Sequence, residues 1–475
     1  MNELQFNALL PYTLLAAASL VVILLIALRQ SHTVIQIVGF LMMCAVAATL
    51  LMVKPLLPVS ILPLFEIDGF ALVFTGMIIF CVFIVGLFSF IYFEEREENP
   101  KEYYILLFLS TLGAATLTIS RHFISLFIAL ELLSVSLYSL IAYLRTRNHA
   151  VEAGMKYLVL AAMSSAFLLF GMALIYMETG SLEFTAIAQK LSQSASPLFI
   201  TGIGLMVVAI GFKLALVPFH FWAADVYQGA PSPVTAFVAT VSKIGVFAVL
   251  LRFASAVELQ SYPVAIYIFS GIAILSMITG NILALKQPNL KRLLAYSSIA
   301  HLGYLLVAFL PGNSAGVNAA IFYLFAYSVT LLAAFGIITL LSTRERDADL
   351  PDTYKGLFWR SPFMASVLTF AMLSLAGIPL TGGFIGKFMV LMSGVQDQLW
   401  LPVIVLVLTS VLGLYYYLRV VILLFADAPP AVKKERTLHP FFYTATYLAL
   451  VVLSALLLWA GVYPGTFIDS IKSFL

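Results

Sequence analysis

Charged residues are scarce in this chain of 475 residues: only 10% are Asp, Glu, Lys or Arg, against about 25% in an ordinary soluble domain. This scarcity excludes a soluble globular protein. The net charge of +3 is small and dispersed, and no block of five or more basic residues occurs. We therefore expect no nucleic-acid partner.

Cysteine is almost absent. Cys44 and Cys81 both lie in apolar runs, so we interpret them as small hydrophobes rather than as redox residues. The sequence also lacks clustered metal ligands, paired haem ligands and the glycine-rich motifs that bind ATP or dinucleotides. We therefore predict no metal or cofactor in this chain, no ATP-driven pumping and no direct nicotinamide binding.

Long hydrophobic runs dominate instead, because 62% of the residues are hydrophobic. A helix of about 20 apolar residues crosses a bilayer. We expect fourteen such spans, which start near residues 7, 34, 69, 102, 122, 155, 197, 234, 262, 293, 316, 361, 399 and 441. The first run lacks a preceding basic residue, so we read it as a true span rather than a signal peptide. The prediction is an all-α polytopic protein of the lipid bilayer.

Basic residues are unevenly divided between alternate loops, and cytoplasmic loops collect positive charge. One side has Arg29, Arg96, Lys101, Arg145, Arg147, Lys286, Lys291, Arg292, Arg344, Arg346, Lys355, Arg360, Lys433, Lys434 and Arg436. The other side has Lys54, Arg121, Lys190, Arg252 and Lys472. This ratio of three to one predicts that both termini lie outside the cytoplasm, in agreement with an even number of spans.

A few charged residues fall inside the spans, where a charge is costly and marks a candidate ion path. Glu131 lies about nine residues into the fifth span, roughly 14 Å deep at 1.5 Å per residue. Lys243 lies at a similar depth in the eighth span, and Lys213 lies in the inner half of the seventh. One acid and two lysines are therefore expected at a common depth.

Two of the spans contain signals for a broken helix. Pro218 cannot donate an N–H to the carbonyl of Leu214, so the seventh span is expected to break one residue past Lys213. In the twelfth span, Pro379 and nearby glycines interrupt the helix ahead of Lys387. A single proline is often a plain kink, but a lysine beside a break in both halves of the chain indicates a transporter built from repeats.

Three further residues have two interpretations each. His220 and His301 lie near membrane depth, where each is either a proton relay or a histidine satisfied by a hydrogen bond. Lys156 follows Glu152 by four residues, so it forms either an ordinary ion pair at a helix end or a part of the path. We retain all three as additional candidates for the path.

Several long motifs resemble a known family: GFKLALVPFHFWAADVYQGAPSPVTAFVATVSKIGVF, NLKRLLAYSSIAHLGYLLVA, LAGIPLTGGFIGKF, FIALELLSVSLY and YKGLFWRSP. They are similar to the antiporter-like subunits of respiratory complex I, an NADH-quinone oxidoreductase, and of the multisubunit sodium/proton antiporters. The resemblance covers almost the whole chain. It places the family's functional charges on Glu131, Lys213, Lys243 and Lys387.

The resemblance implies a fold of two inverted five-helix repeats, spans four to eight and nine to thirteen. The domains would then be 1–100, 101–260, 261–426 and 427–475. It further implies a bacterial inner membrane and partners that comprise neighbouring membrane subunits and a peripheral redox arm. FMN, iron–sulfur clusters, NADH and quinone would be bound by those partners.

The hypothesis for the mechanism begins with the effect of burial, which disfavours the charged form of an amine, whereas a nearby carboxylate favours it. Movement of Glu131 would thus switch the proton on Lys213. The proton would load near Pro218, pass through water to Lys243, by way of His301, and leave outward from Lys387. Electron transfer from NADH to quinone in partner subunits would supply the energy.

Two alternatives remain open at this point. One is a subunit of a cation/proton antiporter without a redox partner, because the motifs are shared between the two kinds of complex. The other is a membrane subunit that binds quinone and performs the redox chemistry itself, because an apolar quinone pocket needs no diagnostic ligand.

Overall fold

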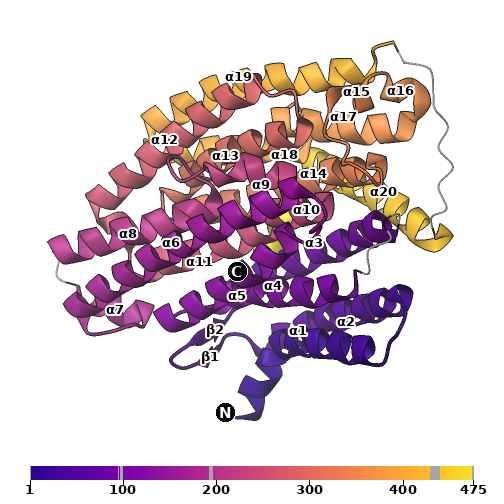
Figure 1. The fold of residues 1–475 in the computed structure, drawn as a ribbon. Helices are drawn as coiled ribbons and strands as arrows, with labels where there is room; N and C mark the ends of the chain where they lie inside the picture. Colours follow the sequence, from indigo (N-terminus) through magenta and orange to yellow (C-terminus); the bar gives the residue numbers. More distant parts are fainter. Residues whose placement is uncertain (1, 95, 97–99, 192–195, 428–438, 473–475) are drawn as a thin grey trace.

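The fold is a bundle of long helices, described by a computed structural model for residues 2–94, 96, 100–191, 196–427 and 439–472 (Figure 1). The first half contains α1 (Glu3–Ala27), α2 (His32–Val53), α3 (Gly69–Glu94), α4 (Lys101–Ile119), α5 (Phe123–Ile141), α6 (Asn148–Thr179), α7 (Phe184–Lys190), α8 (Pro197–Leu214), α9 (Trp222–Gly229), α10 (Ser232–Ala239) and α11 (Val241–Ala256). The second half contains α12 (Pro263–Leu285), α13 (Leu290–Phe309), α14 (Ser314–Leu341), α15 (Pro351–Tyr354), α16 (Leu357–Arg360), α17 (Pro362–Ala376), α18 (Gly382–Gln396), α19 (Trp400–Leu424), α20 (Pro440–Val462) and α21 (Pro464–Lys472).

The expectation of an all-α polytopic membrane protein is confirmed. Within the described residues, 13 helices are long and apolar enough to cross a membrane, with α10 and α11 together forming one of them. The remaining expected span corresponds to α17 and α18, which are each 15 residues long. These two helices are separated by the interruption around Pro379.

Two details differ from the expectation. Helix α6 begins at Asn148, seven residues before the expected apolar run, because the more polar turn that contains Asn148 and Glu152 is also helical. The connection between α2 and α3 contains a short antiparallel hairpin of β1 (Val59–Ile61) and β2 (Phe65–Ile67). Hydropathy does not reveal so short a hairpin, because three-residue strands carry no measurable period.

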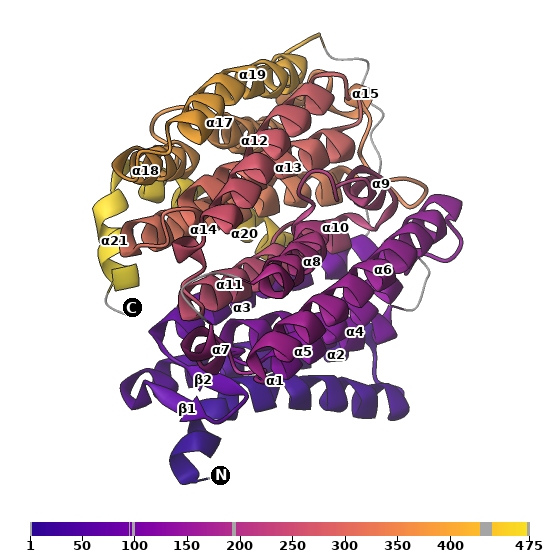
Figure 2. The same cartoon turned by 90° about the vertical axis from the view of Figure 1, so that its left-hand side faces the viewer.

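The helices in the middle of the bundle are the most deeply buried. In both Figure 1 and Figure 2, α1 and α2 lie at one edge and α19 at the opposite edge, with α10, α11 and α14 between them. The apolar window of α10–α11 is 100% buried, against 33% in α1 and in α2. The centre of the molecule is therefore the place where a charged side chain is most fully removed from lipid and water.

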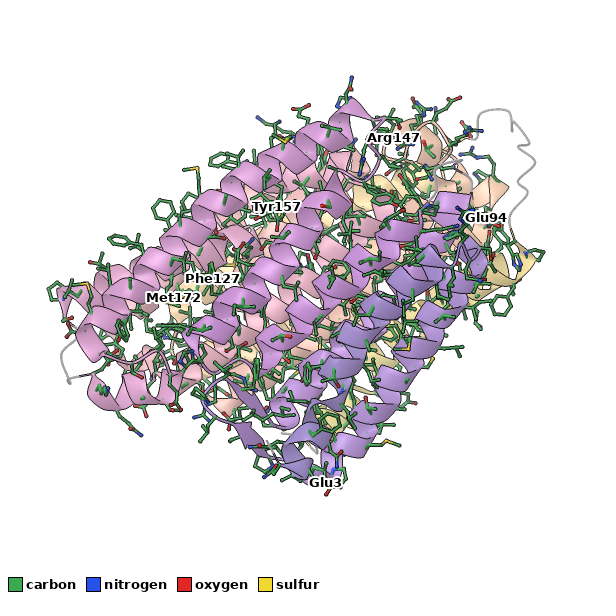
Figure 3. All side chains as sticks on the ribbon, turned by 60° about the horizontal axis from the view of Figure 1, so that its bottom comes forward. Glu3, Glu94, Phe127, Arg147, Tyr157 and Met172 are labelled. Atoms are coloured by element: carbon green, nitrogen blue, oxygen red, sulfur yellow. The ribbon has the colours of Figure 1, made fainter. Side chains whose placement is uncertain are left out.

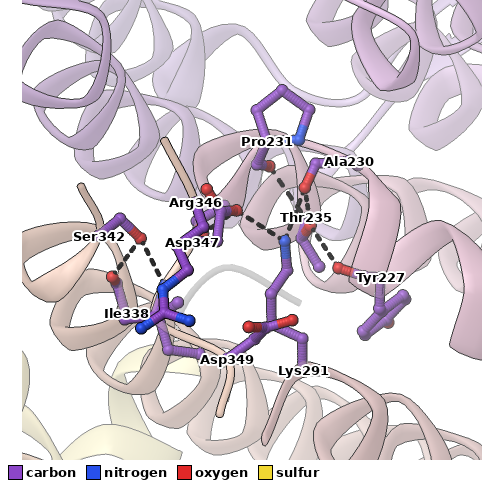
Figure 4. A network of polar contacts seen from close by, with 12 residues as sticks. Tyr227, Ala230, Pro231, Thr235, Lys291, Ile338, Ser342, Arg346, Asp347 and Asp349 are labelled. Atoms are coloured by element: carbon purple, nitrogen blue, oxygen red, sulfur yellow. Dashed lines mark hydrogen bonds and ion pairs between the residues drawn. The ribbon is translucent and has the colours of Figure 1, made fainter. Parts of the chain in front are cut away.

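One end of the bundle is tied together by Asp347, in the loop between α14 and α15, whose side chain is only 8% exposed. Figure 4 shows Asp347 beside Lys291. Five side chains from different parts of the chain contact its carboxylate: Tyr92 at 2.6 Å, Ser232 at 2.7 Å, Lys291 at 2.9 Å, Arg147 at 3.3 Å and Arg96 at 3.5 Å. We call this group the Asp347 cluster. It joins the first half of the chain to the second.

The cluster keeps Asp347 ionised. Burial alone would raise the pKa of the carboxyl group, but the charges of Lys291 and Arg96 outweigh this effect, so the pKa lies well below its ordinary value. The three basic members, Arg96, Arg147 and Lys291, are all among the residues that the sequence assigns to one side of the membrane. Their contact with one carboxylate agrees with the expectation that all three lie on the same side of the membrane.

The opposite end of the bundle has its own ion pairs. Arg252 binds Asp68 at 2.7 Å, and Arg121 binds Glu183 at 2.9 Å. Both arginines belong to the set that the sequence assigns to the other side. Figure 3 shows Arg147 and Glu94 toward one end of the helices and Met172 toward the other. Lys433, Lys434 and Arg436 lie outside the described residues.

Replacement of Asp347 by Asn should destabilise the protein, because removal of one partner of a buried ion pair costs about 3 to 5 kcal/mol. We expect a lower thermal unfolding temperature for Asp347→Asn. The control is Asp352→Asn, at an exposed position in the neighbouring helix α15, which should leave the unfolding temperature unchanged. A carboxyl with a depressed pKa stabilises the fold above the pKa of the unfolded chain, about 3.9, and this contribution is lost as the pH falls below that value. The unfolding temperature of the Asp347→Asn variant should therefore fall less on acidification than that of the parent protein. Equal unfolding temperatures for both variants and the parent would contradict this role.

Candidate functional site

The first helix interruption lies between α8 and α9. Helix α8 ends at Leu214, Ala215 adopts the left-handed conformation with φ 59°, and α9 begins at Trp222, with Pro218 between them. Proline has no N–H, so it cannot satisfy the carbonyl four residues earlier, which is that of Leu214. That carbonyl accepts a hydrogen bond of 3.2 Å from Lys243 of α11 instead.

The second interruption, between α17 and α18, uses the same arrangement. Gly377 takes the left-handed conformation with φ 83° after α17 ends. Pro379 cannot donate to the carbonyl of Leu375. Lys387 of α18 donates to this carbonyl at 2.8 Å and to that of Ala376 at 3.1 Å. Each break thus leaves carbonyls that a buried lysine satisfies, and the negative end of a helix dipole favours such a cation.

Lys213 is the last charged residue before the first break, and only 2% of it is exposed. Its Nζ donates to the Oγ of Ser134 on α5 at 2.6 Å. Glu131 lies three residues earlier on the same face of α5. The carboxylate of Glu131 accepts a hydrogen bond from Ser165 of α6. Among the described residues, the ion pairs within 4.0 Å do not include Glu131 with Lys213, so the carboxylate is held by Ser165 in this state.

Lys243 lies at the junction of the two halves and is 1% exposed. Besides the Leu214 carbonyl, its Nζ contacts the Oγ of Ser298 on α13 at 2.7 Å. The structure therefore connects Lys243 to the broken helix of the first half and to a helix of the second half.

His301 occupies the region between Lys243 and Lys387. It follows Ser298 by one helical turn on α13 and is 3% exposed. Its ring nitrogens contact the hydroxyls of Tyr323 at 2.7 Å and Tyr417 at 3.0 Å. The ring of Tyr304, on the same helix, lies 5.3 Å from the Nζ of Lys387. A continuous group of polar and aromatic side chains therefore extends from Lys243 toward Lys387.

The remaining two candidates lie apart from this group. The Nδ1 of buried His220, in the turn after Pro218, has no hydrogen-bond partner among the described residues, and its ring stacks on Phe221 at 4.6 Å. Lys156 has a half-exposed side chain and binds Glu152 at 2.8 Å and Asp225 at 2.7 Å. The ion pair expected for Lys156 is present, and it lies at the surface of the bundle.

The buried hydroxyl groups of the site were not predicted from the sequence. They belong to Ser134, Ser165, Ser298, Tyr323 and Tyr417. A weak signal exists in the adjacent serines of AYSSIAH, because Ser298 and His301 share a helix face with the required spacing. Within the described residues, no group of three or more His, Cys, Asp or Glu side chains has the arrangement of a metal site.

A polytopic helical bundle with lysines capping two interrupted helices defines an antiporter-like membrane protein. The family model for the transmembrane region of NADH:quinone oxidoreductase and Mrp antiporter subunits matches residues 120–413. The chain belongs to this family.

Individual relatives and one solved structure are similar over almost the full length. Proteins named NADH-quinone oxidoreductase subunit N from Methylococcus capsulatus and Ectopseudomonas mendocina are each 44% identical; the matches cover 98% of this chain and 94% and 96% of the relatives. A chain of respiratory complex I from Thermus thermophilus with bound aureothin is 32% identical, with a TM-score of 0.83, and the match covers 97% of this chain and 99% of that one.

Substitution of Gly383 by Ala should disrupt the second break. A Cβ at Gly383 would lie 2.0 Å from the backbone oxygen of Ser374, in the last turn of the facing helix α17. Overpacking of this kind costs about 1 to 3 kcal/mol or more. We expect a lower thermal unfolding temperature and reduced ion transport. Gly204→Ala, in α8 with no atom within 4 Å of the added Cβ, is the matched control, and equal behaviour of the two variants would contradict close packing at Gly383.

Proposed function

We propose that this chain is a proton-translocating subunit of the membrane arm of an NADH-quinone oxidoreductase. Its family membership and its similarity to proteins named as subunit N support this assignment. The similarity to a chain of a respiratory complex I structure supports the same assembly, with neighbouring membrane subunits and a peripheral arm as partners. The FMN, iron–sulfur clusters, NADH site and quinone site belong to those partners.

The observation that carries the proposal is the attachment of buried lysines to both helix breaks. Lys243 caps the carbonyl freed by Pro218, and Lys387 caps the carbonyl freed by Pro379. A charge in the middle of a membrane protein is costly and is retained for transport. Interrupted helices at that depth line ion pathways, since their backbone groups bind ions and water.

The proposed path follows the contacts of these residues. Glu131 controls the charge on Lys213, because an approaching carboxylate favours the ammonium form. The proton then moves to Lys243, through the region of His301 and its tyrosines, and on to Lys387. The hydrogen bonds between His301 and the two tyrosine hydroxyls support a role for this histidine as a connecting group. His220 and Lys156 are secondary candidates that would act before Lys213.

The proposed direction of transport is from the cytoplasm outward. In this orientation the Asp347 cluster faces the cytoplasm, both termini lie on the outer side of a bacterial inner membrane, and Arg121 and Arg252 lie near the outer face. The separation of the basic residues into two groups, one at each end of the bundle, supports this orientation.

The two breaks also support a pair of inverted repeats, residues 101–260 and 261–426. In this proposal residues 1–100 and 427–475 flank the repeats as accessory spans. The same pairing of a proline break with a lysine cap would then be one functional unit present twice.

Glu131→Gln and Lys213→Ala should each reduce proton pumping by about tenfold or more, the effect expected when a charge-assisted contact of about 1.5 to 3 kcal/mol is lost. The measurement is the NADH-driven pH change in membrane vesicles, normalised to assembled complex through NADH:ferricyanide reduction. Glu178→Gln and Lys190→Ala, at exposed positions, should pump normally. Normal pumping by the Glu131 and Lys213 variants in fully assembled complex would exclude the proposed path.

Lys387 is tested by a pair of substitutions that separate charge from packing. Lys387→Arg preserves a cation near the Leu375 carbonyl, whereas Lys387→Met preserves only the apolar stem. We expect pumping per NADH oxidised to be retained with Arg and lost with Met. Equal pumping by both variants would assign Lys387 to packing alone.

A further inference from the structure

Ser298 is the contact point of four helices at the centre of the molecule. Its Oγ lies 2.7 Å from the Nζ of Lys243 on α11, 2.6 Å from the hydroxyl of Tyr327 on α14 and 3.2 Å from the hydroxyl of Tyr227 on α9. Ser298 is 1% exposed, and both tyrosines are buried. We call these four residues the Ser298 junction.

The junction differs from the serine contact of Lys213, the other buried lysine of the proposed path in the first half. Ser134 accepts from Lys213 but donates its own proton to the carbonyl of Leu130 in the same helix. The proton of this hydroxyl is therefore held by a backbone carbonyl of its own helix. In the described part of the chain, the hydrogen bonds of the Ser298 hydroxyl are all with side chains of other helices, so this hydroxyl remains able to exchange donor and acceptor roles.

The charge on Lys243 determines those roles. A hydroxyl has one proton to donate and two lone pairs to accept with. When Lys243 is an ammonium and donates to Ser298, and Tyr327 also donates, both lone pairs are used and the serine proton points to Tyr227. A neutral amine has a lone pair that accepts the serine proton. The vacant position on the serine oxygen is then filled by the proton of Tyr227, whose O–H direction reverses.

Tyr227 links this reversal to the first helix break. It lies on α9, the short helix that follows Pro218, and the same helix carries Asp225. Asp225 is bound at the bundle surface by Lys156 at 2.7 Å and by Arg292 at 2.8 Å. Helix α9 is therefore held at its surface side by ion pairs and contacted at its inner side by the Ser298 junction.

We propose that Ser298 is a positioning residue that reports the charge of Lys243 to α9 and α14 by reversing the hydroxyls of the Ser298 junction. The inference rests on the proposed function. In this inference, Ser298 connects the broken helix of the first half to the helices of the second half. Proton transfer into the second half then depends on a hydroxyl as well as on the charged side chains.

The test measures pumping per NADH oxidised by the assembled complex in vesicles, for Ser298→Ala, Tyr227→Phe, Tyr327→Phe and Lys243→Ala. We expect Ser298→Ala to lower this ratio by about tenfold or more, as for the loss of one hydrogen bond to a charged group, with NADH:ferricyanide reduction unchanged. The combination of Ser298→Ala with Tyr227→Phe should be no worse than Ser298→Ala alone, because both changes break the same connection.

The matched control is Ser328→Ala, on α14 beside Tyr327. Its buried hydroxyl has no hydrogen-bond partner among the described residues, so this variant should pump normally. If Ser298→Ala pumps normally while Lys243→Ala does not, the inference fails and the proposed function stands. If both pump normally, the proposed function fails as well.

The tyrosine variants distinguish a packing role of Ser298 from a hydrogen-bonding role, because each of them removes one hydroxyl oxygen and keeps the ring. If Ser298→Ala impairs assembly, Tyr227→Phe and Tyr327→Phe decide the question. Reduced pumping by both in assembled complex supports the Ser298 junction, and normal pumping by both overturns it.

Discussion

A carbonyl without a hydrogen-bond donor costs several kcal/mol inside a membrane, and the rest of this structure is arranged around two places where proline creates one. Each freed carbonyl accepts a hydrogen bond from the Nζ of a lysine in another helix. The same contact offsets two costs, those of the unpaired carbonyl and of the buried charge. Neither the break nor the lysine is favourable alone, which explains why they occur together in both halves.

The few other charges stabilise the ends of the bundle. The Asp347 cluster closes one end with three cations around one carboxylate, and Arg252 with Asp68 closes the other. Both groups lie where helix termini meet loops. The Asp347 cluster joins the two halves, whereas Arg252 and Asp68 join α11 to the start of α3 within the first half. The centre, where α10–α11 and α13 are almost entirely buried, holds Lys243 and His301 instead. The residues that form ion pairs at the ends of the bundle are therefore different from the polar residues at its centre.

Much of this arrangement could be predicted because it depends on composition and local chemistry. Apolar runs predicted the spans, and the missing N–H of Pro218 and Pro379 predicted breaks beside a lysine. The partners could not be predicted: Lys213 meets Ser134 across 79 positions, and His301 meets Tyr417 across 116. Serine and tyrosine occur throughout membrane helices, so sequence alone does not distinguish a hydroxyl at the site from one that bonds its own helix. The orientation of Glu131 toward Ser165 also depends on tertiary packing.

The lysine contacts make the geometry of the breaks dependent on charge. A hydrogen bond from an ammonium to a carbonyl is about twice as strong as one from a neutral amine, and the helix end adds attraction only for the charged form. When Lys243 loses its proton, the cap on Leu214 weakens and the hydroxyl of Ser298 turns toward the amine. The end of α8 and the inner side of α9 therefore change their contacts at the same moment. In the proposed path, a proton that passes through Lys243 alters the contacts at the break in the first half, because the same Nζ caps the Leu214 carbonyl.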